Sequence, residues 1–340
     1  MKHNEDFINM SDRIGKNQLL VQGPGGNTSI KNRKGIMDIK ASGKWLSNSK
    51  KEDIFVSVDL VKIRSHIEKQ KIDLFKDVSM TNCRLRPSIE TTLHALMPHK
   101  VVLHTHPIEL LSWLVCKNVK DQLTNEVLSG FSCAWVPYAR PGEELTLAVQ
   151  KALKEKSADI ILLESHGLVV GGENCASTYS LMMQVLNRCH SKDKYNIHEV
   201  NSKNITLSKE LNVRLPIYDE VHALALNDKL FEYCNDGTGV LYPDQAVFLG
   251  KKILCYQGNI NDHNFLFFMK NHKSSSFVIV KGYGVLVSKD SKNDVDIMLR
   301  CHVRILSRLP ENYNLNYLKE SDIDRLLDWE PEKYRVRLDN

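Results

Sequence analysis

Hydrophobic positions along the chain fall into two patterns, one with helical spacing and one of short unbroken runs. In the first half of the chain, the helical spacing predicts helices over residues 1–20, 88–97, 143–156 and 173–190. The short runs, bounded by turn-forming residues, predict strands over residues 28–30, 36–40, 101–106 and 159–163.

A polar stretch separates this half from the rest of the chain. Residues 191–210 are rich in Lys, Asp, Ser and Asn, a composition typical of a domain linker. Beyond it we expect a helix over residues 217–234 and strands over residues 245–249 and 277–280. The predicted domains are a first, larger domain over residues 1–205, a smaller α/β domain over 206–310 and a C-terminal helical tail over 311–340.

One segment of the first half resembles a segment of the second. Residues 161–170 and 278–287 each read as a strand, a polar turn, a glycine and a second strand, and a helical pattern follows both. In this register Tyr283 stands where His166 stands. The smaller domain is therefore predicted to be a degenerate copy without the histidines. The alternative is that two glycine-centred hairpins look alike by chance.

Composition excludes several classes of protein. The net charge of +5 over 340 residues comes without a block of Lys and Arg, so nucleic acid is not an expected partner. The chain has no run of 18 apolar residues, and its first residues are polar, so we expect neither a membrane span nor a signal peptide. The eight cysteines are scattered without a CxxC pair, which favours reduced thiols in a cytoplasmic protein over a cysteine zinc cluster.

The strongest chemical signal is a pair of histidines on a predicted strand. The side chains of His104 and His106 point to one face, about 7 Å apart at the backbone. Imidazole is a preferred ligand of zinc and related ions, and His166, which ends an apolar strand before Gly167, is the candidate third ligand. Three protein ligands leave a position open for substrate, as in a catalytic site. An incidental His-x-His pair is the alternative.

A glutamate precedes this strand. Glu90 lies at the start of the helix over residues 88–97, where a carboxylate near a metal could serve as a fourth ligand or as a base. A solvated glutamate favoured by the helix dipole is the alternative interpretation. His94, one helical turn later, is expected to pack in the protein rather than bind a metal.

Two turns of small residues could bind phosphate oxygens. Residues 25–28, Gly-Gly-Asn-Thr, and residues 41–43, Ala-Ser-Gly, offer backbone N–H groups and hydroxyls, and Ser88 near a helix start could add a donor. The lysine and Ser/Thr tail of a P-loop is absent. Turns of this kind also simply close loops.

Taken in order, these motifs resemble the class II aldolase/adducin family, whose best-known enzymes are L-fuculose-phosphate and L-rhamnulose-phosphate aldolase. The matching stretches, within residues 5–190, are Gly-Gly-Asn-Thr-Ser at 25–29, Ala-Ser-Gly at 41–43, Pro-Ser-Ile-Glu at 87–90, His-Thr-His-Pro at 104–107, Tyr-Ala-Arg-Pro-Gly at 138–142 and Glu-Ser-His-Gly-Leu at 164–168. The resemblance implies a three-layer α/β/α fold around a mostly antiparallel sheet.

The resemblance also implies a role for each matching residue. It implies Zn²⁺, or another divalent transition metal, held by His104, His106 and His166. Glu90 matches the catalytic acid/base, and Tyr138 matches the tyrosine that reaches a neighbouring subunit's site and protonates the aldehyde oxygen. A homo-oligomer, tetramer or dimer, is therefore expected. The implied phosphate cradle consists of Gly26, Asn27, Thr28, Ser42, Gly43 and Ser88.

The implied activity belongs to carbohydrate metabolism. It is the reversible retro-aldol cleavage of a ketose, expected to be a sugar 1-phosphate, into dihydroxyacetone phosphate and an aldehyde through a metal-stabilised enediolate. Metal-dependent epimerases, dehydratases and decarboxylases of sugar phosphates in the same family are the alternative, and an adducin-like scaffold without activity is a third interpretation.

The sequence departs from the family pattern at two places. Ile89 stands where a second serine is expected, which removes one phosphate donor. Residues 211–340 extend past a one-domain aldolase and are expected to pack on the first domain or build an interface, with Trp329 and Tyr334 as anchors.

Overall fold

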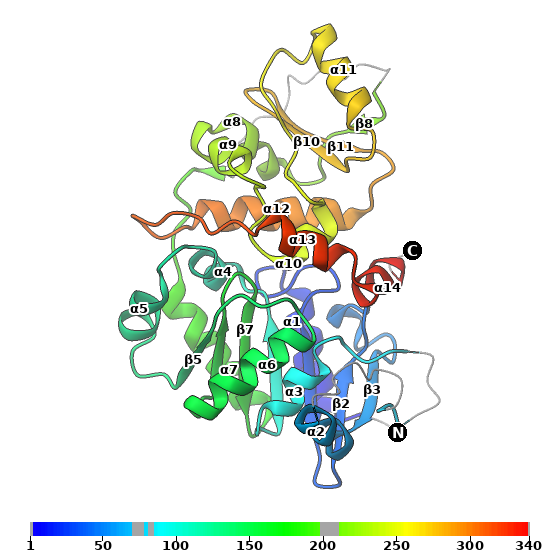
Figure 1. The fold of residues 1–340 in the computed structure, drawn as a ribbon, viewed down its shortest axis with the longest axis vertical. Helices are drawn as coiled ribbons and strands as arrows, with labels where there is room; N and C mark the ends of the chain where they lie inside the picture. Colours follow the sequence, from blue (N-terminus) through cyan, green and yellow to red (C-terminus); the bar gives the residue numbers. More distant parts are fainter. Residues whose placement is uncertain (1–2, 70–77, 81–84, 198–210, 339–340) are drawn as a thin grey trace. The chain divides into compact units, whose positions relative to one another are not determined.

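The computed structural model describes residues 3–69, 78–80, 85–197 and 211–338. The chain forms two compact units (Figure 1). Unit 1 comprises Met1–Leu114, Asn118–His190 and Asp328–Asn340, and unit 2 comprises Val115–Lys117 and Ser191–Leu327. Most of the predicted linker, residues 198–210, lies outside the described residues, and residues 191–197 belong to unit 2.

Unit 1 is built on a seven-stranded sheet in the order β3-β2-β1-β4-β7-β6-β5. Its strands are β1 Asn27–Lys31, β2 Ile36–Lys40, β3 Phe55–Asp59, β4 Val101–Thr105, β5 Cys133–Val136, β6 Ile160–Leu163 and β7 Gly167–Gly172. Neighbouring strands are antiparallel, except for β5 and β6, which are parallel and joined by a helical crossover. The expected α/β fold with a mostly antiparallel central sheet is confirmed.

Helices cover both faces of this sheet. They are α1 Glu5–Lys16, α2 Leu60–Glu68, α3 Thr91–Leu96, α4 Ile108–Leu114, α5 Lys120–Gln122, α6 Glu143–Glu155, α7 Cys175–Cys189 and α14 Glu330–Leu338, with single-turn elements at Leu46–Asn48 and Leu123–Val127. Helices α3 and α6 bury Leu93 and Val149 against Val102 and Val169 of the sheet. Helix α7 lies on the opposite face, where Met182 contacts Thr105 of β4.

Local signals in the sequence explain where these helices begin. The side chain of Asn4 accepts a hydrogen bond from the backbone N–H of Phe7 at 3.0 Å, which caps α1. Asn174 caps α7 in the same way through the N–H of Ser177. In α1, Phe7 and Ile14 are fully buried, as the helical spacing predicts. The helix predicted over residues 88–97 begins only at Thr91, because Glu90 takes the N-cap position.

Unit 2 has a four-stranded sheet in the order β8-β11-β10-β9. Its strands are β8 Val213–Arg214, β9 Cys255–Tyr256, β10 Phe277–Val280 and β11 Gly284–Ser288. Its helices are α8 Ala223–Leu226, α9 Asp228–Asn235, α10 Pro243–Leu249, α11 His263–Asn271, α12 Asn293–Ser307 and α13 Glu320–Leu327, with a 3₁₀ turn at Asp219–His222. The smaller α/β arrangement expected in this half is therefore present, and the strand over 277–280 is confirmed.

Two predictions for unit 2 were wrong in detail. The strand predicted over 245–249 is helix α10, which has Pro243 in its first turn and buries Ala246 and Leu249, three residues apart. The helix predicted over 217–234 is interrupted at Asn227, whose side chain accepts a hydrogen bond from the N–H of Leu230 and starts α9.

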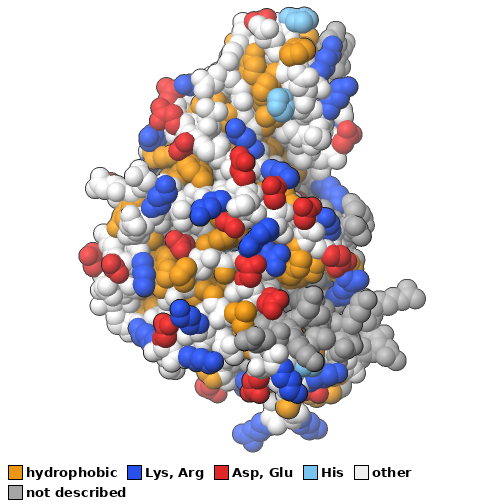
Figure 2. Space-filling view, in the orientation of Figure 1, with side chains coloured by type: hydrophobic (Ala, Val, Ile, Leu, Met, Phe, Trp, Pro, Cys, Tyr) orange, Lys and Arg blue, Asp and Glu red, His pale blue; other side chains and the backbone are white. Residues whose placement is uncertain are grey.

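The two sheets share a local arrangement. Strands β4-β7-β6-β5 and β8-β11-β10-β9 have the same order and the same pattern of directions. In the two hairpins, Leu163 pairs with Gly167 and Val280 pairs with Gly284. No helix in the described parts of the chain is long and apolar enough to cross a membrane. On the face drawn in Figure 2, basic and acidic side chains are interspersed.

Candidate metal centre

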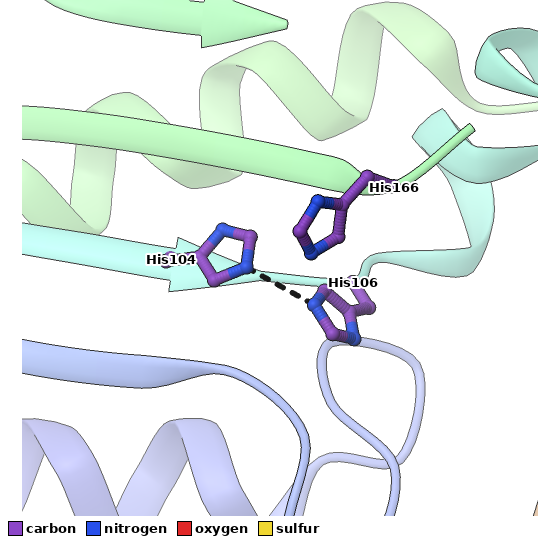
Figure 3. A group of neighbouring side chains, drawn as sticks. All are labelled: His104, His106 and His166. Atoms are coloured by element: carbon purple, nitrogen blue, oxygen red, sulfur yellow. Dashed lines mark hydrogen bonds between the residues drawn. The ribbon is translucent and has the colours of Figure 1, made fainter. Parts of the chain in front are cut away.

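Two histidines that are two residues apart and a third that is distant in the sequence meet at one end of strand β4. His104 lies on β4, His106 follows the strand, and His166 lies in the turn between β6 and β7. All three are buried, and one ring nitrogen of each lies within 4.8 Å of the other two (Figure 3). The Nε2 atoms of His104 and His106 are 3.1 Å apart. These distances suit nitrogen atoms that share one cation, so the residues present fit a metal ion.

The strand pairing explains why His166 arrives at this place. Strands β4 and β7 are antiparallel neighbours, and β7 begins directly after His166. The preceding residue, Ser165, adopts a left-handed conformation with φ of +50°, which tightens the turn. A Cβ atom on Gly167 would lie 2.4 Å from the carbonyl oxygen of Thr105 and 3.0 Å from Cδ2 of His106. Only glycine allows the turn to approach β4 so closely.

A backbone contact orients the ring of His104. Its Nδ1 lies 3.0 Å from the carbonyl oxygen of Leu168, an acceptor, so Nδ1 carries the proton and donates. The lone pair of Nε2 is then directed at the other two histidines. This arrangement is the usual way in which a protein fixes the tautomer of a metal-binding histidine.

A carboxylate faces the same cluster. Glu90 Oε2 is 3.3 Å from His104 Nε2, and Glu90 Oε1 is 3.3 Å from His166 Nε2. Burial by itself raises the pKa of Glu90, whereas positive charge on the surrounding histidines, and a hydrogen bond from His104, hold that pKa well below the ordinary value when those rings are protonated. Glu90 is buried and ionised, unlike a solvated glutamate at a helix start.

Two residues from the predicted phosphate cradle hold this carboxylate. The side-chain amide of Asn27 donates to Glu90 Oε2 at 2.8 Å and to the hydroxyl oxygen of Ser88 at 3.1 Å. The backbone N–H of Glu90 also donates to that hydroxyl, at 3.2 Å. Asn27 and Ser88 therefore help to position Glu90, whatever else they bind.

The remaining cradle residues divide into two groups. The N–H of Ser42 donates to the carbonyl of Arg86 at 2.9 Å, which brings the Ser42–Gly43 turn beside the loop that carries Ser88. Gly26 adopts a φ of +61° next to β4. Thr28 is the exception. Its hydroxyl lies 2.8 Å from the hydroxyl of Ser11 on α1, away from the cradle residues.

Sequence reasoning missed a buried lysine behind the cradle. Lys40 is only 2 % exposed, and its Nζ donates to the carbonyls of Pro24 at 2.9 Å and Lys44 at 2.6 Å. It therefore links the two small-residue turns. The only signal was a lysine directly before Ala-Ser-Gly, and on a strand such a residue usually lies in solvent.

Tyr138 and His94 occupy different surroundings. Tyr138 lies half-buried in the loop after β5, and its backbone N–H donates to Glu164, two residues before His166. His94 is buried with its Nδ1 2.7 Å from the hydroxyl of Ser29, and burial is the main cause that holds its pKa well below the ordinary value. As expected, His94 is a packed helix residue outside the three-histidine cluster.

Comparisons with known proteins agree with this geometry. Residues 5–191 match the class II aldolase and adducin N-terminal domain family. A curated relative, the uncharacterised oxidoreductase YuxG of Bacillus subtilis (strain 168), is 30% identical over 213 residues. That match covers 58% of this chain and 30% of the relative, so the chain spans less than a third of its length.

Solved structures also resemble a part of this chain. The N-terminal class II aldolase domain of a conserved Thermoplasma acidophilum protein is 27% identical, with a TM-score of 0.47, over 56% of this chain and 94% of that one. L-fuculose-1-phosphate aldolase from Thermus thermophilus is 18% identical, with a TM-score of 0.37, over 54% and 92%. With its family match over more than half of the sequence and its buried three-histidine cluster, this chain belongs to the class II aldolase and adducin family.

Proposed function

We propose that this protein is a metal-dependent class II aldolase-type lyase that cleaves a ketose, expected to be a 1-phosphate, into dihydroxyacetone phosphate and an aldehyde. The observation that supports this most is the buried cluster of His104, His106 and His166 with an ionised carboxylate, Glu90, against it. A structural zinc site has four protein ligands, whereas three imidazoles beside a carboxylate suit catalysis.

Zn²⁺, or another divalent transition metal, would be held by the three histidines. When bound, it would supply Lewis-acid stabilisation of the negative charge that develops on substrate oxygens as the carbon–carbon bond breaks. The hydrogen bond from His104 Nδ1 to Leu168 fits this role, because it leaves Nε2 unprotonated for the ion.

The protein's own residues would move the protons. Glu90, ionised in its surroundings, is the base for the carbon of the dihydroxyacetone phosphate part, and Asn27 keeps its Oε2 in place. Tyr138 would protonate the oxygen of the departing aldehyde. Because Tyr138 lies in a half-exposed loop, we propose that it acts in a neighbouring subunit's site of a homo-oligomer.

The phosphate group would bind between the two small-residue turns. Ser42, Gly43 and Ser88 offer N–H and hydroxyl donors there, and the ammonium of Lys40 behind them adds positive charge. The isoleucine at position 89 offers no hydroxyl, so the backbone contributes more of the binding.

Exchange of dihydroxyacetone phosphate protons tests this proposal. In D₂O, the metal-loaded protein should exchange one C3 proton, the one Glu90 removes, as followed by proton NMR, and chelation of the metal should stop the exchange. Release of dihydroxyacetone phosphate from a panel of ketose 1-phosphates would establish the lyase reaction. Exchange without cleavage of any ketose would instead favour an epimerase, dehydratase or decarboxylase. Protein that retains no divalent ion would favour a scaffold.

A further inference from the structure

The last described residues of the chain return to unit 1. Helix α13 ends at Leu327 in unit 2, and the residues from Asp328 onward belong to unit 1. There they place two aromatic side chains, Trp329 and Tyr334, against two arginines of unit 1. We call residues 329–334 the C-terminal clamp.

The first contact of the clamp is with the loop that carries Tyr138. The guanidinium of Arg140 lies 5.1 Å from the ring centroid of Trp329. The same ring lies against Gly142, where an added Cβ would be 2.4 Å from Cη2 of Trp329. Gly142 also has a φ of +95°, so a side chain there would be strained as well as obstructed. Trp329 thus covers the loop at both ends of the Arg140–Gly142 turn.

The second contact is with the loop that carries Ser88. The guanidinium of Arg86 lies 3.9 Å from the ring centroid of Tyr334, and its Nη1 lies 3.4 Å from both carboxylate oxygens of Glu330. Stacking on one face and an ion pair at the edge hold the same guanidinium from two directions. The Arg86 side chain is 38 % exposed, so the stacking contributes more to its order than the screened ion pair.

The backbone groups of both arginines lie in the loops that build the candidate site. The carbonyl of Arg86 accepts from the N–H of Ser42, and Ser88 follows two residues later. The carbonyl of Arg140 accepts from the N–H of Leu145 at the start of α6, and Tyr138 precedes it by two residues. The clamp therefore contacts the proposed phosphate loop and the proposed proton-donor loop.

We propose that the C-terminal clamp is a positioning element of the active site, holding the loop of Ser88 through Tyr334 and the loop of Tyr138 through Trp329. This inference rests on the proposed function for the roles of those two loops. A reaction that needs both loops in fixed positions loses rate when either is released, because small displacements of reacting groups are costly.

Hydrogen exchange tests the contact itself without any substrate. Amides of residues 137–142 should exchange about tenfold faster in Trp329→Ala, and those of residues 85–90 in Tyr334→Ala, because each loop loses its cover. Strands β4 and β7 should exchange as in the wild type, and metal content should not change. The matched control is Phe267→Ala, which removes an aromatic side chain that is 61 % exposed in unit 2.

Kinetics separate positioning from general stability. With dihydroxyacetone phosphate exchange as the assay, Tyr334→Ala should raise KM about fivefold and leave kcat unchanged. Exchange does not use Tyr138, so Trp329→Ala should leave exchange unchanged and instead lower kcat about fivefold when cleavage of a ketose 1-phosphate is the assay. Trp329→Phe and Tyr334→Phe keep an aromatic face for the arginines, so their KM and kcat should lie close to the wild-type values.

Several results would overturn the proposal. They are unchanged exchange in both loops, faster exchange throughout unit 1, and equal changes of KM and kcat in both variants. If the wild type exchanges no dihydroxyacetone phosphate protons, the proposed function fails, but the hydrogen-exchange result still decides whether the clamp holds the two loops.

Discussion

At the scale of single residues, the candidate site depends on a few side chains that are held by partners inside unit 1. Nδ1 of His104 donates a hydrogen bond to the backbone, and Glu90 accepts one from Asn27. Nζ of Lys40 donates to two backbone carbonyls. Such fixed partners mean that the donor atoms are in place before any ligand binds. Substitutions at this scale should therefore separate metal binding from proton transfer.

Removal of one histidine should abolish metal binding. In His106→Ala the other two imidazoles remain, but a two-nitrogen site binds zinc far more weakly than a three-nitrogen one. We expect loss of the bound ion after dialysis, measured by elemental analysis, together with loss of turnover. His190→Ala, whose side chain is 61 % exposed, is the matched control. Full metal retention in His106→Ala would refute the site.

Removal of the carboxylate charge should leave metal binding intact and slow proton transfer. Glu90→Gln keeps the shape of the side chain and the three histidines, so the ion should stay bound. Without the base, proton exchange on dihydroxyacetone phosphate should slow by roughly 10²- to 10⁴-fold. Glu232→Gln, at a side chain 62 % exposed in unit 2, should leave the rate unchanged. An unchanged rate in Glu90→Gln would exclude Glu90 from proton transfer.

At the scale of elements, sequence patterns predicted the strands of the site well because local periodicity determines them. His104 and His106 share a face because successive side chains along an extended strand point to opposite faces. The Ser-His-Gly segment is recognisable in the sequence as the end of a strand. The orientation of Thr28 toward Ser11 depends on pairing between distant segments, which no local pattern carries. The buried position of Lys40 depends on such pairing too, and the short apolar run of α10 fits a strand and a helix equally.

Helix α12 should make unit 2 sensitive to acid. Its His302 is fully buried with Nδ1 3.1 Å from the Gln245 amide, and burial lowers its pKa from 6.5 to about 3. Above pH 6.5 His302 is neutral in the folded and the unfolded chain, so it does not change how the free energy of unfolding depends on pH. Between pH 6.5 and 3 the unfolded chain binds a proton that the folded unit does not, so stability falls as pH falls, by about 1.4 kcal/mol per pH unit.

Urea unfolding of the whole protein at several pH values measures this effect. The stability of His302→Gln should depend less steeply on pH than that of the wild type in this window, whatever the variant loses in absolute stability. His190→Gln, changed at an exposed side chain, should keep the wild-type slope. Equal slopes in the wild type and His302→Gln would mean that His302 does not carry the effect.

At the scale of the whole molecule, we infer that unit 2 is a duplicated copy of the second half of unit 1 that has lost its metal ligands. The shared strand order and hairpin register support this inference. Counting along the paired strands, Leu215 and Ile217 occupy the positions of His104 and His106, and Tyr283 that of His166. The protein should therefore bind one divalent ion per chain by elemental analysis, and a second ion tightly bound in unit 2 would contradict the loss of its metal ligands.

Subunit mixing tests whether two copies of the chain share a site. If Tyr138 acts in a neighbour's site, His106→Ala chains alone and Tyr138→Phe chains alone are each inactive in cleavage of a ketose. After mixing and exchange of subunits, some sites would combine an intact metal centre with an intact tyrosine, and activity should return. Mixtures of His106→Ala with Glu90→Gln should stay inactive, because both changes affect one chain's own centre. No recovery in the first mixture would place Tyr138 in its own chain's site or outside catalysis.

Unit 1 is discontinuous in the sequence, because residues 191–327 of unit 2 separate its main part from Asp328 onward. During synthesis, the ribosome releases all three histidines and Glu90 long before it adds Trp329 and Tyr334. The nascent chain can thus bring its three histidines and Glu90 together early, while the loops of Ser88 and Tyr138 lack the contacts of Trp329 and Tyr334 until residues 329–334 emerge. If the C-terminal clamp acts as proposed, a chain that still lacks residues 329–334 turns over substrate more slowly than one that has them.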